Sequence, residues 1–220
     1  MQKKHHKIWI LIVIIVVLLV GLGTGYVLYR RQSTAPVSVE TTLEYAPENV
    51  VCFYQKDDAW KSDKLGDSQY TMSNSGCLTC CVAAVLQMQG FSVDGLSADA
   101  DAGEVNRFFS GQGVYDSEGN LQWDVLEQVT GISVTKKDAS ELAAEELDKH
   151  LEDGCYPIVR VRVGGTGSYH YVLIVSSTDG EYWCMDPLEK AETLVPLSDF
   201  GGKIYAVRFL QWESRILDET

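Results

Sequence analysis

The fold is decided by Ser75-Gly76-Cys77-Leu78-Thr79-Cys80-Cys81-Val82-Ala83-Ala84-Val85-Leu86. The run from Cys77 to Gln89 is apolar almost throughout, and Gly90 follows it. Glycine is common just past the end of a helix, so we expect a buried helix over residues 77–89. Cys77 would then lie at the helix N-terminus, where the macrodipole and a neighbouring imidazolium both favour the reactive thiolate form of cysteine.

A histidine and an aspartate far downstream supply the other groups that cysteine chemistry needs. His170 opens an apolar strand, and Asp186 follows the next one. A five-residue hairpin loop over 176–180 would pair Val175 with Glu181. Counting back places His170 opposite Asp186, with Cβ atoms about 5 Å apart. A carboxylate at that distance orients an imidazole and fixes its tautomer.

Only one of the four histidines suits the role of the base. Two precede an apolar N-terminal stretch, and His150 lies near the end of a charged helix, where an imidazole favours the helix dipole. His170 is the remaining candidate. We therefore predict a thiol hydrolase in which Cys77 is the nucleophile, His170 the base and Asp186 the orienting carboxylate.

Helices dominate the first half of the chain and strands the second. We predict an α+β fold in which an N-terminal helical half packs on an antiparallel sheet. Valines alternate with Arg160 and Arg162 over residues 159–163, which is the period-two pattern of a half-buried strand. Ser140 is expected to cap the clearest amphipathic helix, which ends before Gly154. The other expected elements are helices at 97–109, 124–129 and 140–153, and strands at 170–175, 181–185 and 203–211.

The N-terminal part has the pattern of a membrane anchor. Residues 8–29 carry no charge and are numerous enough to cross the roughly 30 Å hydrocarbon core of a bilayer as a helix. The stretch is longer than the apolar region of a cleaved signal peptide and ends in Tyr-Arg-Arg. Three lysines before it favour a cytoplasmic tail over 1–7 and an extracytoplasmic C-terminal part. We expect a single-pass cell-membrane protein with a transmembrane helix at 8–29, a linker at 30–43 and one domain at 44–220.

Charge is unevenly distributed along the chain. None of the 31 acidic residues precedes residue 36, whereas five of the 18 basic residues do. The part from residue 36 onward therefore has a formal charge of −18. This argues against nucleic-acid binding, which needs clustered lysine and arginine.

The other cysteines allow an alternative chemistry. Cys77-Leu78-Thr79-Cys80 is a Cys-x-x-Cys, the motif of thiol–disulfide oxidoreductases, although no clear strand leads into it. Cys80, Cys81 and Cys184 lie in apolar runs and are expected as small buried hydrophobic residues. A second pair of zinc ligands is missing, so we expect no metal site, and no cofactor is implied.

Several segments together resemble the bacteriocin-processing peptidase superfamily, the papain-like peptidases that remove double-glycine leaders. Residues 76–86 are similar to its nucleophile helix. Tyr54-Gln55-Lys56-Asp57-Asp58-Ala59-Trp60 is similar to the Gln-x-Asp-x-x-Trp of its stand-alone members. The resemblance covers roughly residues 50–190. The segments that follow in the family's order are 154–159, 170–172 and 186–187.

The resemblance implies a papain-like cysteine peptidase fold and a peptide or protein substrate. It implies Cys77 as the nucleophile, His170 as the base that becomes the acid, and Asp186 as its orienter. It also implies Gln55 as the donor to the oxyanion. Gln69 is the alternative donor, because it lies closer to Cys77 in the sequence.

The chain departs from the family directly after the cysteine. Where many relatives have Gly-Pro-Thr or similar after the cysteine, this chain has Leu78-Thr79-Cys80-Cys81. We therefore do not carry leader-peptide cleavage over to this chain. A non-catalytic peptide-binding module on a degenerate peptidase fold is the alternative to the enzyme, although the complete Cys–His–Asp set argues against it.

Overall fold

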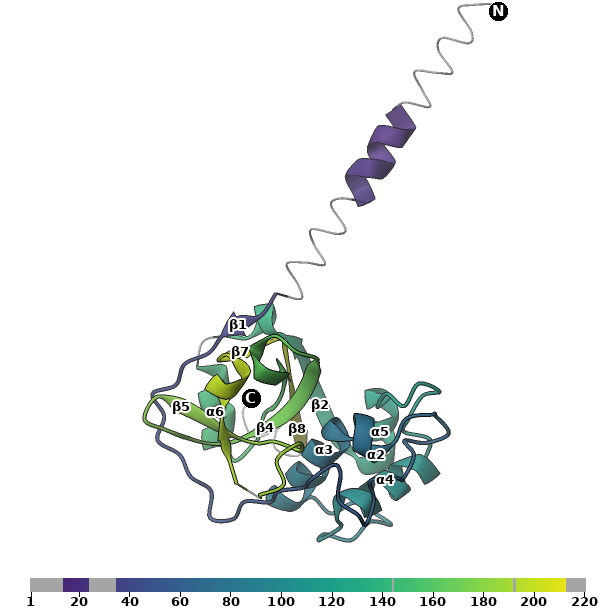
Figure 1. Ribbon diagram of the computed structural model, residues 1–220, viewed down its shortest axis with the longest axis vertical. Coiled ribbons are helices and arrows are strands. Elements are labelled where there is room, and N and C mark those ends of the chain that lie inside the picture. Colours follow the sequence, from purple (N-terminus) through teal and green to yellow (C-terminus); the bar gives the residue numbers. More distant parts are fainter. Residues whose placement is uncertain (1–13, 24–34, 144, 192, 213–220) are drawn as a thin grey trace, which may run out of the picture. The chain divides into compact units, whose positions relative to one another are not determined.

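The computed structural model describes residues 14–23, 35–143, 145–191 and 193–212, in two units with a boundary after Ala35 (Figure 1). In the first unit, residues 14–23 are helical and their large apolar side chains are exposed. The predicted tail 1–7, both ends of the predicted span 8–29 and residues 30–34 of the predicted linker lie outside the described residues. Among the residues that are described, we find no helix long and apolar enough to span a membrane.

The second unit combines helices with an antiparallel sheet, as predicted, and its first half is helical (Figure 1). The predicted helix at 77–89 is confirmed as α3, Cys77–Met88, and Gly90 follows it with a φ of +66°. The helix predicted at 97–109 begins later, because Asp101 and Glu104 cap its start reciprocally. The remaining helices here are α2 (Met72–Ser75), α4 (Ala102–Gly111) and α5 (Trp123–Thr130).

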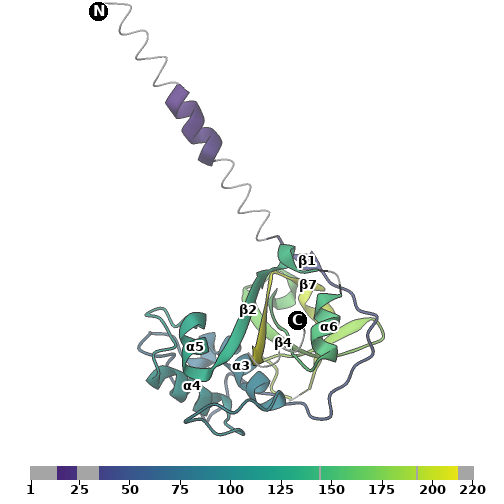
Figure 2. The same cartoon turned by 180° about the vertical axis from the view of Figure 1, so that it is seen from behind.

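The second half forms a six-stranded sheet in the order β2-β8-β3-β4-β5-β6, with every neighbouring pair antiparallel. Helix α3 contacts β4 and β3, and α5 contacts β2 at the edge of the sheet (Figure 2). The first strand of the sheet, β2, was not predicted. The strands are β2 (Ile132–Asp138), β3 (Ile158–Arg162), β4 (Tyr169–Thr178), β5 (Glu181–Met185), β6 (Val195–Pro196) and β8 (Ala206–Trp212).

The predicted loop between β4 and β5 is wrong. The strands are joined by a two-residue turn, Asp179-Gly180, whose φ angles are +52° and +79°. Two positive φ angles match the right-handed twist of a hairpin, so β4 extends to Thr178. Thr178 pairs with Glu181, and a register shift follows between Ile174 and Ser176. The expected pairings of Val175 with Glu181 and of His170 with Asp186 across the hairpin therefore do not occur.

The helix predicted at 140–153 is wrong in its first half. Asp138 and Glu141 cap a short 3₁₀ turn, η1 (Ala139–Glu141), so Ser140 is not the cap. Glu145 then has a φ of +67°, and the α-helix α6 covers only Glu146–Glu152. The predicted strand at 203–211 is likewise divided into β7 (Lys203–Ile204) and β8.

An extended segment, residues 36–45, precedes the helical half and lies along the sheet half; we call it the N-terminal strap. Its strand β1 (Val37–Ser38) pairs with β7. Tyr45 bridges to Ser177 of β4, with backbone N···O distances of 2.8 and 2.9 Å in the two directions. The strap is thus attached to the same hairpin that carries His170.

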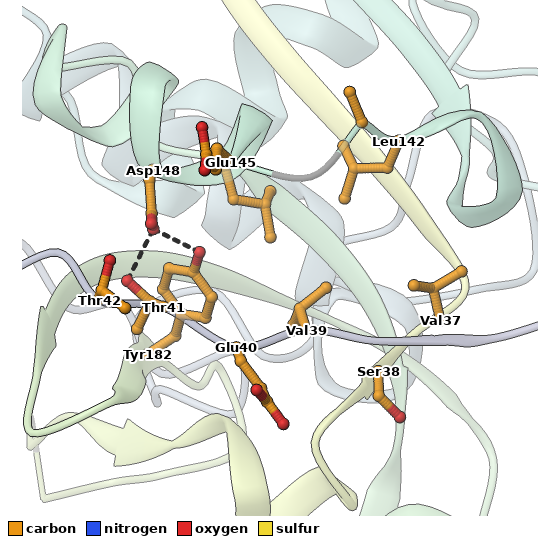
Figure 3. A pocket seen from close by; sticks show the side chains of 12 residues that line it. Val37, Ser38, Val39, Glu40, Thr41, Thr42, Leu142, Glu145, Asp148 and Tyr182 are labelled. Atoms are coloured by element: carbon orange, nitrogen blue, oxygen red, sulfur yellow. Dashed lines mark hydrogen bonds between the residues drawn. The ribbon is translucent and has the colours of Figure 1, made fainter.

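The carboxylate of Asp148 joins the middle of the strap to α6 and β5. Thr41 Oγ1 donates to Asp148 Oδ1 at 2.7 Å, and Tyr182 Oη donates to the same oxygen at 2.5 Å (Figure 3). A cavity of about 470 Å³ lies beside this junction, between the strap, α6 and β5. Because Tyr182 is buried, its hydroxyl depends on this acceptor.

Candidate active site

Cys77 is the first residue of α3, and a close approach of two helices holds it there. The N–H of Gly76 donates to Met72 O at 2.9 Å, so α2 runs directly into α3. A Cβ at Gly76 would lie 2.5 Å from Met72 O and 2.8 Å from Met72 Cα. Only glycine fits this junction, and the thiol of Cys77 is left half-buried at the helix start.

His170 and Asp186 form the shortest hydrogen bond described at the site. His170 Nε2 lies 2.6 Å from Asp186 Oδ1, and the histidine is 4% exposed. Asp186 Oδ1 also accepts from the backbone N–H of Leu188 at 2.8 Å, which fixes the carboxylate just beyond β5. With Nε2 engaged by the carboxylate, Nδ1 is the ring nitrogen left for the thiol.

The electrostatics of His170 favour an imidazolium at neutral pH. Burial by itself lowers the pKa of His170. Hydrogen bonds with Asp186 and Cys77, and the charges of both groups, outweigh that effect and raise the pKa to about 9. Cys77 is thus near enough to His170 to act on the charge of the imidazole. A protonated imidazole beside a thiol stabilises the thiolate.

Gln55 is held between α2 and the residue after Asp186 by two hydrogen bonds. Its backbone N–H donates to Pro187 O at 2.9 Å, next to Asp186. Its Nε2 donates to Ser73 O at 2.8 Å, which uses one of two amide protons and leaves the other for a ligand. Its Oε1 is buried without a hydrogen-bond partner among the described residues. Gln69, by contrast, is exposed.

The residues that follow Gln55 explain its position. Asp57 Oδ1 accepts from the N–H of Ala59 at 2.8 Å and closes a tight turn. Trp60 Nε1 donates to Tyr54 O at 3.0 Å, so the indole ties the turn back to the residue before Gln55. The aspartate and the tryptophan of the upstream motif thus build the turn that presents the amide.

A cleft of about 460 Å³ opens beside Cys77. Its walls are rich in aromatic side chains from both halves of the domain, which the sequence did not reveal, because they come together only in the folded chain. Glu118 is its one carboxylate among the described residues. The aromatic residues that line it are Tyr70, Tyr115, Trp123, Tyr169 and Tyr171.

The oxidoreductase alternative does not fit the elements around the Cys-x-x-Cys, because no strand leads into it. Cys80, Cys81 and Cys184 are fully buried, as predicted. Burial raises the pKa of all three thiols, so they are poor nucleophiles. A short helix, rather than a strand, precedes the Cys-x-x-Cys. The described residues also contain no group of three metal-ligating side chains close enough to hold an ion.

No protein-family model and no curated protein sequence matches the chain. Twelve chains of solved structures match its structure. One of them, from Bacillus anthracis, is described as a C39-like peptidase. It aligns with a TM-score of 0.48 and 13% sequence identity, over 76% of this chain and 98% of that chain. At this level of likeness, the function of this chain has to be argued from its own residues.

We expect Gly76→Ala to displace the start of α3. The added methyl group overlaps the backbone of Met72, so the free energy of unfolding should fall by about 1–3 kcal/mol and Cys77 should react more slowly. Urea unfolding and the alkylation rate of Cys77 measure the two effects. Gly111→Ala is the matched control, because a Cβ there meets nothing within 4 Å. Equal behaviour of the two variants would show that the junction does not depend on glycine.

Proposed function

We propose that the chain is a cysteine peptidase, a thiol hydrolase of peptide or amide bonds with a Cys77-His170-Asp186 triad. The observation that carries the proposal is the 2.6 Å contact of the buried His170 imidazole with the Asp186 carboxylate, together with the nearby Cys77 thiol, which raises the pKa of that imidazole. That arrangement is the one required by a nucleophile, its base and the group that orients the base.

The residues divide the reaction as follows. The Cys77 thiolate attacks the carbonyl carbon, and the resulting oxyanion accepts hydrogen bonds from Gln55 Nε2 and from the Cys77 backbone N–H. Protonated His170 gives its proton to the leaving amine, so the C–N bond breaks and an acyl-thioester remains. His170 then takes a proton from water, whose oxygen attacks the thioester; the C–S bond breaks, the carboxylic acid leaves, and the Cys77 thiolate and protonated His170 are regenerated. Asp186 keeps the imidazole oriented throughout.

Cys77 is expected to be the preferred target of iodoacetamide near pH 7. His170→Ala should lower its alkylation rate there by roughly tenfold, because the imidazolium that stabilises the thiolate is lost. Above about pH 9 the wild-type imidazole is neutral, so the difference between the two proteins should shrink. Mass spectrometry of tryptic peptides gives the rate at each thiol.

Cys77→Ser should abolish this preferential labelling. Cys52→Ser is the matched control, because Cys52 is also half-buried. Slow, uniform labelling of several cysteines would contradict the proposal. Rapid labelling of Cys77 without hydrolysis of any peptide would instead favour the non-catalytic binding module.

Gln55→Ala tests the oxyanion donor. It should reduce the hydrolysis of a library of short synthetic peptides by about 10²–10³-fold, since a donor that acts in the transition state is removed. The iodoacetamide rate of Cys77 should stay near that of the wild type, because alkylation forms no oxyanion. Gln69→Ala, at an exposed position, is expected to leave both rates unchanged. If Gln69→Ala gave the larger loss, the two roles would be reversed.

We also propose that residues 8–29 anchor the protein in the cell membrane with the peptidase domain outside. The support is the uncharged stretch itself and the three lysines before it. A membrane-impermeant maleimide added to intact cells should therefore label Cys77, and Cys77→Ser should lose most of that label. Labelling only after lysis would place the domain in the cytoplasm.

A further inference from the structure

Three of the four arginines in the described part of the chain gather on the sheet; we call Arg160, Arg162 and Arg208 the arginine cluster. Arg160 and Arg162 alternate along β3, and their guanidinium carbons lie 4.7 and 4.2 Å from the ring centre of Tyr169 on β4. Arg162 also lies 5.4 Å from the ring centre of Tyr205. Arg162 Nη1 donates to Gly167 O at 2.8 Å. Stacking on an aromatic face leaves the remaining N–H groups of a guanidinium available for a ligand.

The third arginine comes from β8. The guanidinium carbon of Arg208 lies 5.9 Å from the ring centre of Trp123, and its Nη1 donates to Val207 O at 2.7 Å and to Lys137 O at 3.2 Å. Asp138 is the one carboxylate whose charge acts on Arg208. It is too distant to form an ion pair with it in the described structure.

The arginine cluster has backbone carbonyl partners but no carboxylate partner among the described residues. None of its members forms an ion pair with a carboxylate among the described residues, although the chain from residue 36 onward carries a charge of −18. Nε of Arg160 and Nε of Arg208 are buried without a hydrogen-bond partner there. Burial and the charge of Arg160 both lower the pKa of Arg208. Gathering these charges costs free energy that an anion would offset.

The arginine cluster adjoins the cleft of Cys77. Tyr169 and Trp123, on which the arginines stack, both line that cleft. Tyr171, another lining residue, pairs directly with Arg160 across β3 and β4. Glu118, the carboxylate of the cleft, comes from the helical half and not from the sheet. The arginines themselves do not line the cleft, so a ligand meets their positive charge where it extends from the cleft past Tyr169 and Tyr171 along the sheet.

We propose that the arginine cluster binds a carboxylate of the peptide that occupies the cleft, so that the preferred substrates are acidic peptides. The inference rests on the proposed peptidase function. Carboxylates match the fork of a guanidinium, and two or three arginines together select for them. The carboxylate can belong to an aspartate or glutamate side chain or to the C-terminus of the substrate.

Protection of Cys77 against iodoacetamide tests this binding on the full chain. The probes are three pentapeptides: a glutamate peptide with an amidated C-terminus, the same peptide with glutamine, and the glutamine peptide with a free C-terminal carboxylate. The glutamate peptide amide should slow alkylation at a roughly tenfold lower concentration than the glutamine peptide amide. Protection by the free-acid glutamine peptide alone would assign recognition to the terminal carboxylate. Either difference should weaken at high salt.

Substitutions identify the residues responsible. Arg162→Gln, and separately Arg160→Gln, should remove the preference and leave the alkylation rate without peptide unchanged. Arg107→Gln is the matched control, since it loses the same charge on α4, where Arg107 pairs with Asp63. Glu118→Gln should not reduce the preference either.

Two other outcomes would be decisive. Equal protection by all three peptides, with Cys77 still reacting selectively, would overturn this inference and leave the peptidase proposal standing. Failure of Cys77 to react selectively without any peptide would overturn both.

Discussion

The packing of α3 against β4 is the contact on which the rest of the structure depends. Residues 79–86 of α3 are buried almost all round, so this helix is stable only inside the domain. Cys81 Sγ lies 3.6 Å from Tyr171 O, which brings the first turns of α3 alongside the start of β4. This apolar interface is therefore part of the core and also fixes the distance between Cys77 and His170. A substitution that changes side-chain volume there should alter both the stability of the domain and that distance.

Two positively charged sites in this domain differ in whether a negative group compensates their charge. His170 is buried, and its positive charge is compensated by Asp186 and by the thiol beside it. The arginine cluster is only partly buried, and stacking on Tyr169 and Trp123 supplies its main contacts. The hydrogen bond with Asp186 fixes the orientation of the charged imidazole. The arginine cluster has no such counter-charge, so an anionic ligand would stabilise it.

Features of the fold and of the site could be predicted from the sequence where they depend on residues close together in the chain. The helix at Cys77 follows from a continuous apolar run, and β3 follows from the alternation around Arg160, because both patterns are local. The β4–β5 loop was predicted wrongly, because residues 176–178 are polar and were assigned to the loop. They pair with β5 instead, and the two-residue turn Asp179-Gly180 joins the strands. The contact of His170 with Asp186 does occur, although the strand pairing that predicted it is wrong. Asp186 lies past the end of β5, so its position does not depend on the register of the two strands.

The aromatic cleft and the arginine cluster combine residues from strands and helices that are far apart in the sequence. No local sequence pattern predicts either of them.

The N-terminal strap determines the order in which attachments of the domain would break under a pulling force. A pull on the chain at Pro36 meets β1 first, then the Thr41 hydroxyl held by Asp148, and last Glu44 and Tyr45. These last two residues bind the turn and the end of β4, the strand that begins beside His170. The attachments lie in series, so tension arriving from the N-terminal side would have to part the first two before it reached the hairpin.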